Sequence, residues 1–288
     1  MSECFSTLPC KLKLFKNPEL IKESKLTKNL NSTSYLIVLL TSWLLIFSPV
    51  ISADVEVVDE SLGMKLERVA VPVRGGDLLD IDVVIFYRAK MRQADYPDFI
   101  ELEKDIRKWV AGYQKSREQK GGYVYWEMLT KYLAESVLEN YTTINRIDLE
   151  ATVYPTAATS YTHFVNTTVM RHSNPEQGYT IVESISLPIE RYGIEQQGPN
   201  VIDLLTTLTY KPGINSSEYP DFDPVYKDLF SMMENYPIET DYWETMIKAM
   251  SAELLAKYSA FSEVTMDMNV YPTASLTYPH RVKATTRR

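Results

Sequence analysis

The segment Val153-Tyr154-Pro155-Thr156-Ala157 returns 117 residues later as Val270-Tyr271-Pro272-Thr273-Ala274. The same separation relates Tyr125-Trp126-Glu127 to Tyr242-Trp243-Glu244. Five further residues keep this spacing: Tyr141, Tyr161, His163, Val165 and Thr168 return as Tyr258, Tyr278, His280, Val282 and Thr285. A spacing held over so long a stretch predicts an internal duplication, which defines the architecture before any single element is assigned.

Upstream of these motifs the two copies match at a different offset. Tyr96-Pro97-Asp98-Phe99 returns as Tyr219-Pro220-Asp221-Phe222, now 123 residues apart, so the first copy carries about six extra residues. The polar run 115–122 reads as a helix end and loop and is where we place them. Further upstream, Val71-Pro72-Val73 is matched to Leu187-Pro188-Ile189.

Each copy has the same predicted order of elements. A β-rich stretch comes first (66–87 and 180–210), in which Ile81, Val83 and Ile85 alternate with other residues as in a half-buried strand. Two amphipathic helices follow, and two long strands close the copy. This order predicts an α+β protein of two tandem β-β-α-α-β-β units, each an antiparallel sheet with two helices on one face. The open sheet edges favour assembly with further copies.

The N-terminal segment differs from the rest of the chain. Six lysines precede a mostly apolar run at 35–47, and small residues lead to Ala53. These are the parts of a secretory signal, so residues 1–53 are predicted to be a signal peptide; a retained membrane anchor is the alternative. The expected division is then 54–171 for the first repeat, 172–178 for a linker and 179–288 for the second repeat. The expected location is periplasmic or secreted.

Composition narrows the function classes. The formal net charge is −8, and it is more negative without the Lys-rich N-terminal segment, which argues against nucleic acid as a partner. Both cysteines, Cys4 and Cys10, lie in the predicted signal, so the rest of the chain offers no disulfide and no thiolate nucleophile. No Gly-x-Ser-x-Gly and no Gly-rich phosphate loop occurs, and no cofactor is predicted.

The element order and the duplication resemble the tunnelling fold, or T-fold. The chain is similar to urate oxidase in carrying two units, and to dihydroneopterin aldolase in the layout of each unit. The resemblance covers residues 65–288 and implies assembly through sheet edges, with a planar purine or pterin ring bound between units. In aldolase-like members a Glu near the start of the second helix anchors the ring. Glu127 and Glu244 hold that position here, where a carboxylate could accept two N–H bonds from the ring edge. The alternative is that both are ordinary first-turn acids, favoured by the helix dipole.

Two other sets of residues are candidates. Tyr154, Tyr271, Tyr161 and Tyr278 flank the Pro-Thr-Ala turns and could stack on a ring while their hydroxyls hydrogen-bond. His163 and His280 are equivalent in the repeat and are weak candidates for a metal pair, the alternative being packing or surface residues. The family's zinc-binding His triad and its other catalytic sets have no counterpart in this sequence.

Two functional hypotheses follow. In the first, an exported tandem T-fold protein binds a purine- or pterin-like heterocycle at a repeat or subunit interface, with catalysis undecided. In the second, the protein is a non-catalytic periplasmic oligomeric scaffold or interaction protein. Both predict a homo-oligomer, and both predict a membrane partner only if the N-terminal segment is uncleaved.

Overall fold

The computed structural model describes residues 60–71, 77–88, 91–118, 125–156, 159–274 and 277–288. The predicted signal peptide lies outside these residues. The strands are β1 (Ser61–Val71), β2 (Asp77–Tyr87), β3 (Ile144–Val153), β4 (His163–Arg171), β5 (Tyr179–Ile194), β6 (Asn200–Tyr210), β7 (Phe261–Val270) and β8 (His280–Arg287). The helices are η1 (Gln93–Asp95), α2 (Phe99–Glu118), α3 (Trp126–Asn140), η2 (Pro175–Gln177), α4 (Phe222–Glu234) and α5 (Trp243–Lys257).

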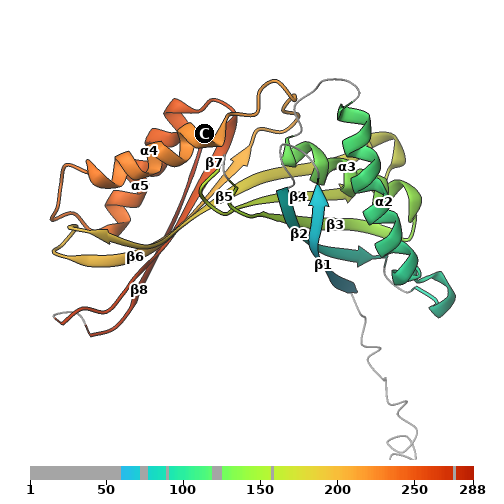
Figure 1. Ribbon diagram of the computed structural model, residues 1–288, viewed down its shortest axis with the longest axis horizontal. Coiled ribbons are helices and arrows are strands. Elements are labelled where there is room, and N and C mark those ends of the chain that lie inside the picture. Colours follow the sequence, from blue (N-terminus) through green and yellow to red (C-terminus); the bar gives the residue numbers. More distant parts are fainter. Residues whose placement is uncertain (1–59, 72–76, 89–90, 119–124, 157–158, 275–276) are drawn as a thin grey trace, which may run out of the picture. The chain divides into compact units, whose positions relative to one another are not determined.

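All eight described strands form one antiparallel sheet in the order β1 to β8 (Figure 1). β4 pairs with β5, so the two units share a sheet, and residues 172–178 form the connection between these strands. Gly178 closes the connection at a φ of +70°, which glycine adopts without a steric penalty. The predicted α+β fold of two β-β-α-α-β-β units is confirmed.

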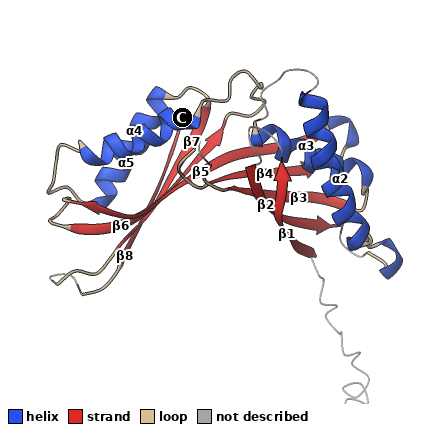
Figure 2. Cartoon of the chain, in the orientation of Figure 1, coloured by secondary structure: helices blue, strands red, loops and turns tan. Residues whose placement is uncertain are grey.

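Each unit has its own core between its helices and its half of the sheet (Figure 2). α3 packs over β3 and β4, and α5 packs over β7 and β8. Ile81, Val83 and Ile85 are buried, as their alternation predicts, because one sheet face lies under the helices. Among the described helices, none is both long enough and apolar enough to cross a membrane.

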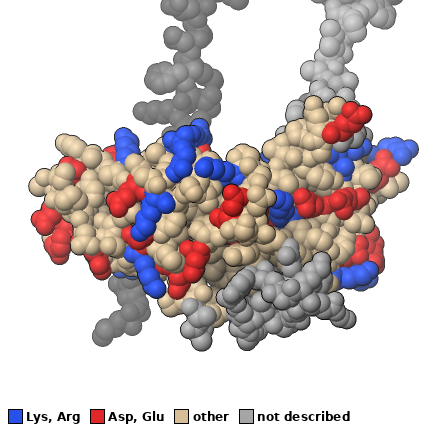
Figure 3. Space-filling view, turned by 90° about the horizontal axis from the view of Figure 1, so that it is seen from above, with Lys and Arg blue, Asp and Glu red and all other residues tan. Residues whose placement is uncertain are grey.

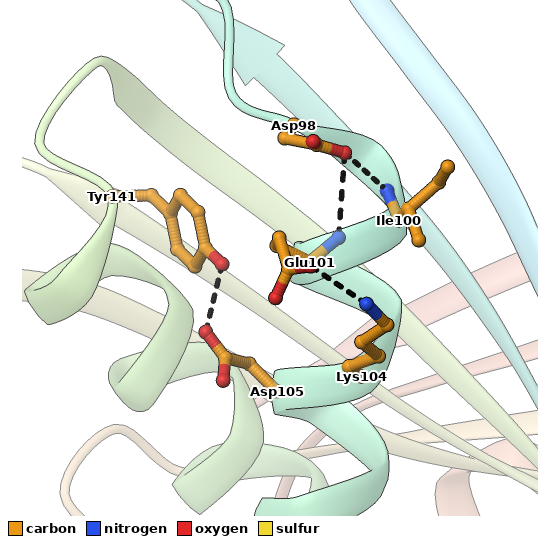
Figure 4. A network of polar contacts seen from close by, with 6 residues as sticks. All are labelled: Asp98, Ile100, Glu101, Lys104, Asp105 and Tyr141. Atoms are coloured by element: carbon orange, nitrogen blue, oxygen red, sulfur yellow. Dashed lines mark hydrogen bonds and ion pairs between the residues drawn. The ribbon is translucent and has the colours of Figure 1, made fainter.

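The same polar contact fixes the helix pair in both units. In the first, Asp98 begins α2 by accepting the backbone N–H of Ile100 at 2.9 Å, and the Tyr141 hydroxyl donates to Asp105 Oδ2 at 2.9 Å (Figure 4). In the second, the Tyr258 hydroxyl donates to Asp228, the residue equivalent to Asp105. A tyrosine after the second helix therefore ties it to the first helix in each copy. α2 has 20 residues and α4 has 13, so the extra length of the first copy includes a longer helix.

A β-bulge recurs in the first strand of each unit. In β1, Glu67 and Arg68 together oppose Asp80, and Arg68 has a φ of +48°. Asp80 accepts the backbone N–H of Arg68 at 2.9 Å and the hydroxyl of Tyr154 at 2.8 Å. These bonds stabilise the charged carboxylate, and the Arg68 N–H, as the largest cause, lowers the pKa of Asp80.

The bulge in β5 has the same construction. Arg191 has a φ of +51°, and Asp203 accepts its backbone N–H at 2.8 Å and the hydroxyl of Tyr271. The two bulges align Arg68 with Arg191, so Val71 corresponds to Ile194. The match of Val71 to Leu187 is therefore wrong; Pro72 and Val73 lie outside the described residues. The repeated Glu-Arg pair is the sequence signal that marks the true alignment.

Arg68→Gly is expected to be more stable than Arg68→Ala by about 1 kcal/mol, because a Cβ is disfavoured at this positive φ. The free energy of unfolding in urea measures the difference. As a control, the same pair of substitutions at Lys65, in the extended part of β1, should give the opposite order. A more stable alanine at position 68 would contradict the bulge geometry.

Candidate functional site at the seam between the units

Polar side chains collect where the two units meet. Here α3 of the first unit lies against β5, β6 and the approach to α4 of the second. We call these five residues the seam cluster: Glu127, Lys131, Glu183, Tyr210 and Tyr219. The cluster brings together both of the buried glutamates among the described residues, Glu127 and Glu183; Asp80 and His163 are buried elsewhere.

Glu127 lies in the first turn of α3 and is 0% exposed. Its Oε1 accepts the Tyr210 hydroxyl at 2.6 Å, while its Oε2 is buried without a hydrogen-bond partner among the described residues. Burial raises the pKa of Glu127 to about 7, because a carboxylate loses its hydration there, and the Tyr210 hydrogen bond opposes that rise. The group can therefore hold or release a proton near neutral pH.

A second chain of contacts runs beside the first. The Tyr219 hydroxyl donates to Glu183 Oε1 at 2.7 Å, and Lys131 Nζ lies 3.7 Å from Glu183 Oε2. The Tyr210 ring meets the Tyr219 ring edge-on, with centroids 5.1 Å apart. The two carboxylates are thus held in one buried arrangement, with a single lysine as their positive neighbour in the cluster.

A pocket of about 270 Å³ opens over this cluster. Its lining, the seam pocket, consists of Tyr113, Met128, Lys131, Tyr132, Glu135, Ile214, Ser216 and Tyr219. The Tyr113 and Tyr132 rings lie 5.0 Å apart and tilted by 31°. Aromatic walls with a few polar groups suit a flat, partly polar molecule.

The structure separates the two predicted ring anchors. Glu127 is fully buried under the Tyr210 hydroxyl and does not line the seam pocket, so a ring bound in this pocket would not touch it without a rearrangement. Glu244 occupies the same position in α5 but is exposed, because β8 is an edge strand and no further unit covers it. One repeated residue therefore has two environments.

The four predicted tyrosines are also spread over the molecule, and none lines the seam pocket. Tyr154 and Tyr271 hold the bulges, and the Arg191 guanidinium lies 3.8 Å from the centre of the Tyr271 ring. Tyr161 is stacked on Tyr226, with centroids 3.8 Å apart and ring planes within 12°. Tyr278 is exposed beside His280. A ligand-binding role for these residues stays a prediction.

The two predicted metal candidates differ in the same way. His163 is buried near the rings of Tyr161 and Phe222. Burial lowers its pKa to about 4, so the imidazole is neutral at pH 7. His280 is only half-buried, on the edge strand. Within the described ranges, no three or more His, Cys, Asp or Glu side chains group as a metal site.

The sequence interpretation missed Lys131, Glu183, Tyr210 and Tyr219. A signal for Glu183 exists, because it falls in the same alternation as Ile185 and Leu187 and therefore faces the helices. A glutamate on the buried face of a strand indicates a partnered site.

Comparison with solved structures identifies proteins with a similar fold. No protein-family model matches the chain, and no curated protein matches it in sequence. Solved structures do match. A uricase from Bacillus fastidious shares 13% identity with a TM-score of 0.55, covering 78% of this chain and 92% of that one. Urate oxidase from Bacillus sp. TB-90 shares 12% identity with a TM-score of 0.54, covering 74% of this chain and 88% of that one. Uricase from Arthrobacter globiformis shares 11% identity with a TM-score of 0.53, covering 80% of this chain and 94% of that one.

The protein is thus an α+β protein with an internally duplicated, eight-stranded sheet. More particularly, it has the tandem T-fold seen in these urate oxidases, as the sequence resemblance predicted. At such low identity the likeness concerns the fold.

Glu127 makes stability depend on pH. Between its ordinary pKa of 4.5 and about 7, the folded protein keeps a proton that the unfolded chain has released. Its contribution to the free energy of unfolding therefore falls as pH rises through this window. Glu127→Gln should remove that fall. The free energy of unfolding of the variant, relative to that of the wild type, should therefore rise by up to about 3 kcal/mol between pH 5 and 8.

Urea unfolding at several pH values, taken as the difference between variant and wild type, isolates Glu127 from other titrating groups such as His163. Glu139→Gln, exposed on the same helix, is the control and should leave the difference near zero. A flat difference for Glu127→Gln would mean that this carboxyl is hydrated in solution.

Proposed function

We propose that the protein binds a planar heterocycle of purine or pterin size in the seam pocket. The observation that carries this is the pocket itself, with aromatic walls beside the half-buried Lys131 and the buried Glu183 and Tyr219. In this proposal the ring packs against Tyr132 and Tyr219, while Lys131 and Glu135 make polar contacts with its edge. The proposal is one of binding at a repeat interface, and no reaction is assigned.

The character of the pocket and the likeness in fold both support a heterocycle as the ligand. Ligand pockets combine mostly apolar walls with a few polar groups, and titratable residues with shifted pKa values gather at such sites. Flat rings stack well on tyrosine. The proteins that share this fold are named for oxidation of urate, a purine.

On the face shown in Figure 3, acidic and basic side chains are interspersed, so a polyanion meets no basic stripe there.

A second candidate function, an exported oligomeric scaffold, is favoured by a different observation. Large aromatic side chains are exposed at both free edges of the sheet: Tyr96 and Phe99 on the β1 side, Tyr242 and Tyr278 on the β8 side. Exposed apolar groups of this kind mark interaction surfaces. Export rests on the N-terminal segment alone and is tested by sequencing the N-terminus of the protein recovered from its host.

Titration calorimetry with urate and neopterin as probes tests the binding proposal. Saturable binding of at least one probe is expected, and Tyr132→Ala should weaken it at least about tenfold by removing one stacking wall. Phe164→Ala is the matched control, because residue 164 lies in β4 on the sheet face opposite the helices.

The absence of saturable binding for both probes at millimolar concentration would overturn the proposal. Binding that survives Tyr132→Ala unchanged would remove the seam pocket as the site.

A further inference from the structure

A second pocket, of about 530 Å³, lies along one flank of α4. We call it the α4 groove, and its lining includes Tyr161, Asp223, Tyr226, Lys227, Phe230 and Glu234. The last five belong to α4 and follow one another at helical spacing, so they form a stripe along one side of that helix. The groove and the seam pocket have no lining residue in common.

Aromatic rings form a continuous row beside this groove. Tyr161 stacks on Tyr226, and Phe230 meets Tyr226 edge-on with centroids 5.0 Å apart. Tyr192 of β5 meets Phe230 edge-on at 5.4 Å. Tyr226 and Phe230 are only half-buried, so part of each ring is open to solvent. Because a positive charge is attracted to an aromatic ring face and methylene groups pack on it, the row suits a cation with an apolar chain.

Carboxylates lie at both ends of the groove. Asp223 and Glu234 are eleven residues apart on α4, which corresponds to about 16 Å along the helix axis. Burial is the largest cause that raises the pKa of Tyr161, and the negative charges of Asp223 and Asp221 add to it. At the other end, burial and then the charge of Glu234 raise the pKa of Tyr192. Negative charge therefore acts at each end of the aromatic row.

Lys227 is the one cation among the described residues that line the groove. Its Nζ lies 3.8 Å from Asp223 Oδ2, and its side chain is 78% exposed. An exposed pair of this kind contributes little to stability, and its lysine can turn into water, so Asp223 stays available to another ammonium group.

The first unit has a different surface at the equivalent place. Glu103 and Arg107 stand 123 positions before Tyr226 and Phe230, and they form an exposed ion pair with an N···O distance of 3.0 Å. The duplication therefore does not account for the aromatic row on α4. Packing against Tyr161 accounts for Tyr226, but it explains neither the half-buried ring of Phe230 nor the carboxylates at both ends.

We propose that the α4 groove binds a linear polyamine, which is a flexible methylene chain with an ammonium group at each end. One terminal ammonium group pairs with Asp223 and the other with Glu234, while the chain between them lies across Tyr226 and Phe230. This inference is independent of heterocycle binding in the seam pocket.

Other small ligands fit the groove less well. An anion meets two carboxylates and a single lysine, and a compact cation reaches one end only. Two separated positive charges joined by an apolar chain match the groove at both ends and along its length. The formal net charge of −8 also attracts a polycation to the protein over longer distances.

Titration calorimetry on the full-length protein tests the inference with two probes, spermine and putrescine. Extended spermine reaches from Asp223 to Glu234, whereas putrescine carries the same terminal groups on a chain too short to do so. Saturable binding of spermine is expected, at least about tenfold tighter than that of putrescine, because the two ends act jointly. Similar dissociation constants for both probes, or no saturable spermine binding at millimolar concentration, would overturn the inference.

Substitutions separate the groove from a general attraction to an acidic surface. Glu234→Gln and Phe230→Leu should each weaken spermine binding about threefold or more, by removing a carboxylate and a ring face. Lys227→Ala should strengthen it, because a competing cation is removed. Glu139→Gln, which removes the same charge from an exposed site on α3, is the matched control and should leave binding near that of the wild type.

Equal losses in Glu234→Gln and Glu139→Gln, or weaker binding in Lys227→Ala, would mean that spermine binds elsewhere and would sink the inference. Urate or neopterin binding is expected to match the wild type in all four variants, because none of these residues lines the seam pocket. The two proposals therefore fail separately.

Discussion

The backbone pairing of β4 with β5 is the constraint on which the rest of the structure depends. It fuses two duplicated units into one sheet, brings α3 against the second unit and creates the seam. Without this pairing Glu127 would be as exposed as Glu244, and neither the buried carboxylate chain nor the pocket over it would exist. The environment of a repeated residue in the first turn of α3 or α5 therefore depends on whether a neighbouring unit covers it.

Much of the fold could be predicted because duplication and alternation are local, repeated signals. The spacing of Tyr-Pro-Thr-Ala fixed the copies, and Ile81, Val83 and Ile85 indicated a buried strand face. The candidate site was harder to predict from the sequence. The duplication points to pairs of equivalent residues, whereas the seam combines non-equivalent positions of the two copies, such as Lys131 and Glu183. The match of Val71 to Leu187, seven residues before its true equivalent Ile194, also hid the equivalence of the bulges.

Symmetry nevertheless identifies what each half lacks. Tyr210 and Tyr87 share sequence position and ring geometry but differ in hydrogen bonding, since the hydroxyl of Tyr210 has Glu127 and that of Tyr87 has no described acceptor. Comparison between copies thus separates features that come from the unit itself, such as the Tyr141–Asp105 contact and its counterpart, from features that come from a neighbour.

The paired bulges mark positions in β1 and β5 at which a single residue can be deleted. Elsewhere in a half-buried strand, gaining or losing one residue turns every following side chain to the opposite face. At Glu67–Arg68 and Glu190–Arg191 two residues already oppose one, so loss of either residue restores regular pairing and leaves the flanking faces unchanged. These are the positions in β1 and β5 where single-residue length differences between descendants of the duplication can be absorbed without inverting the core.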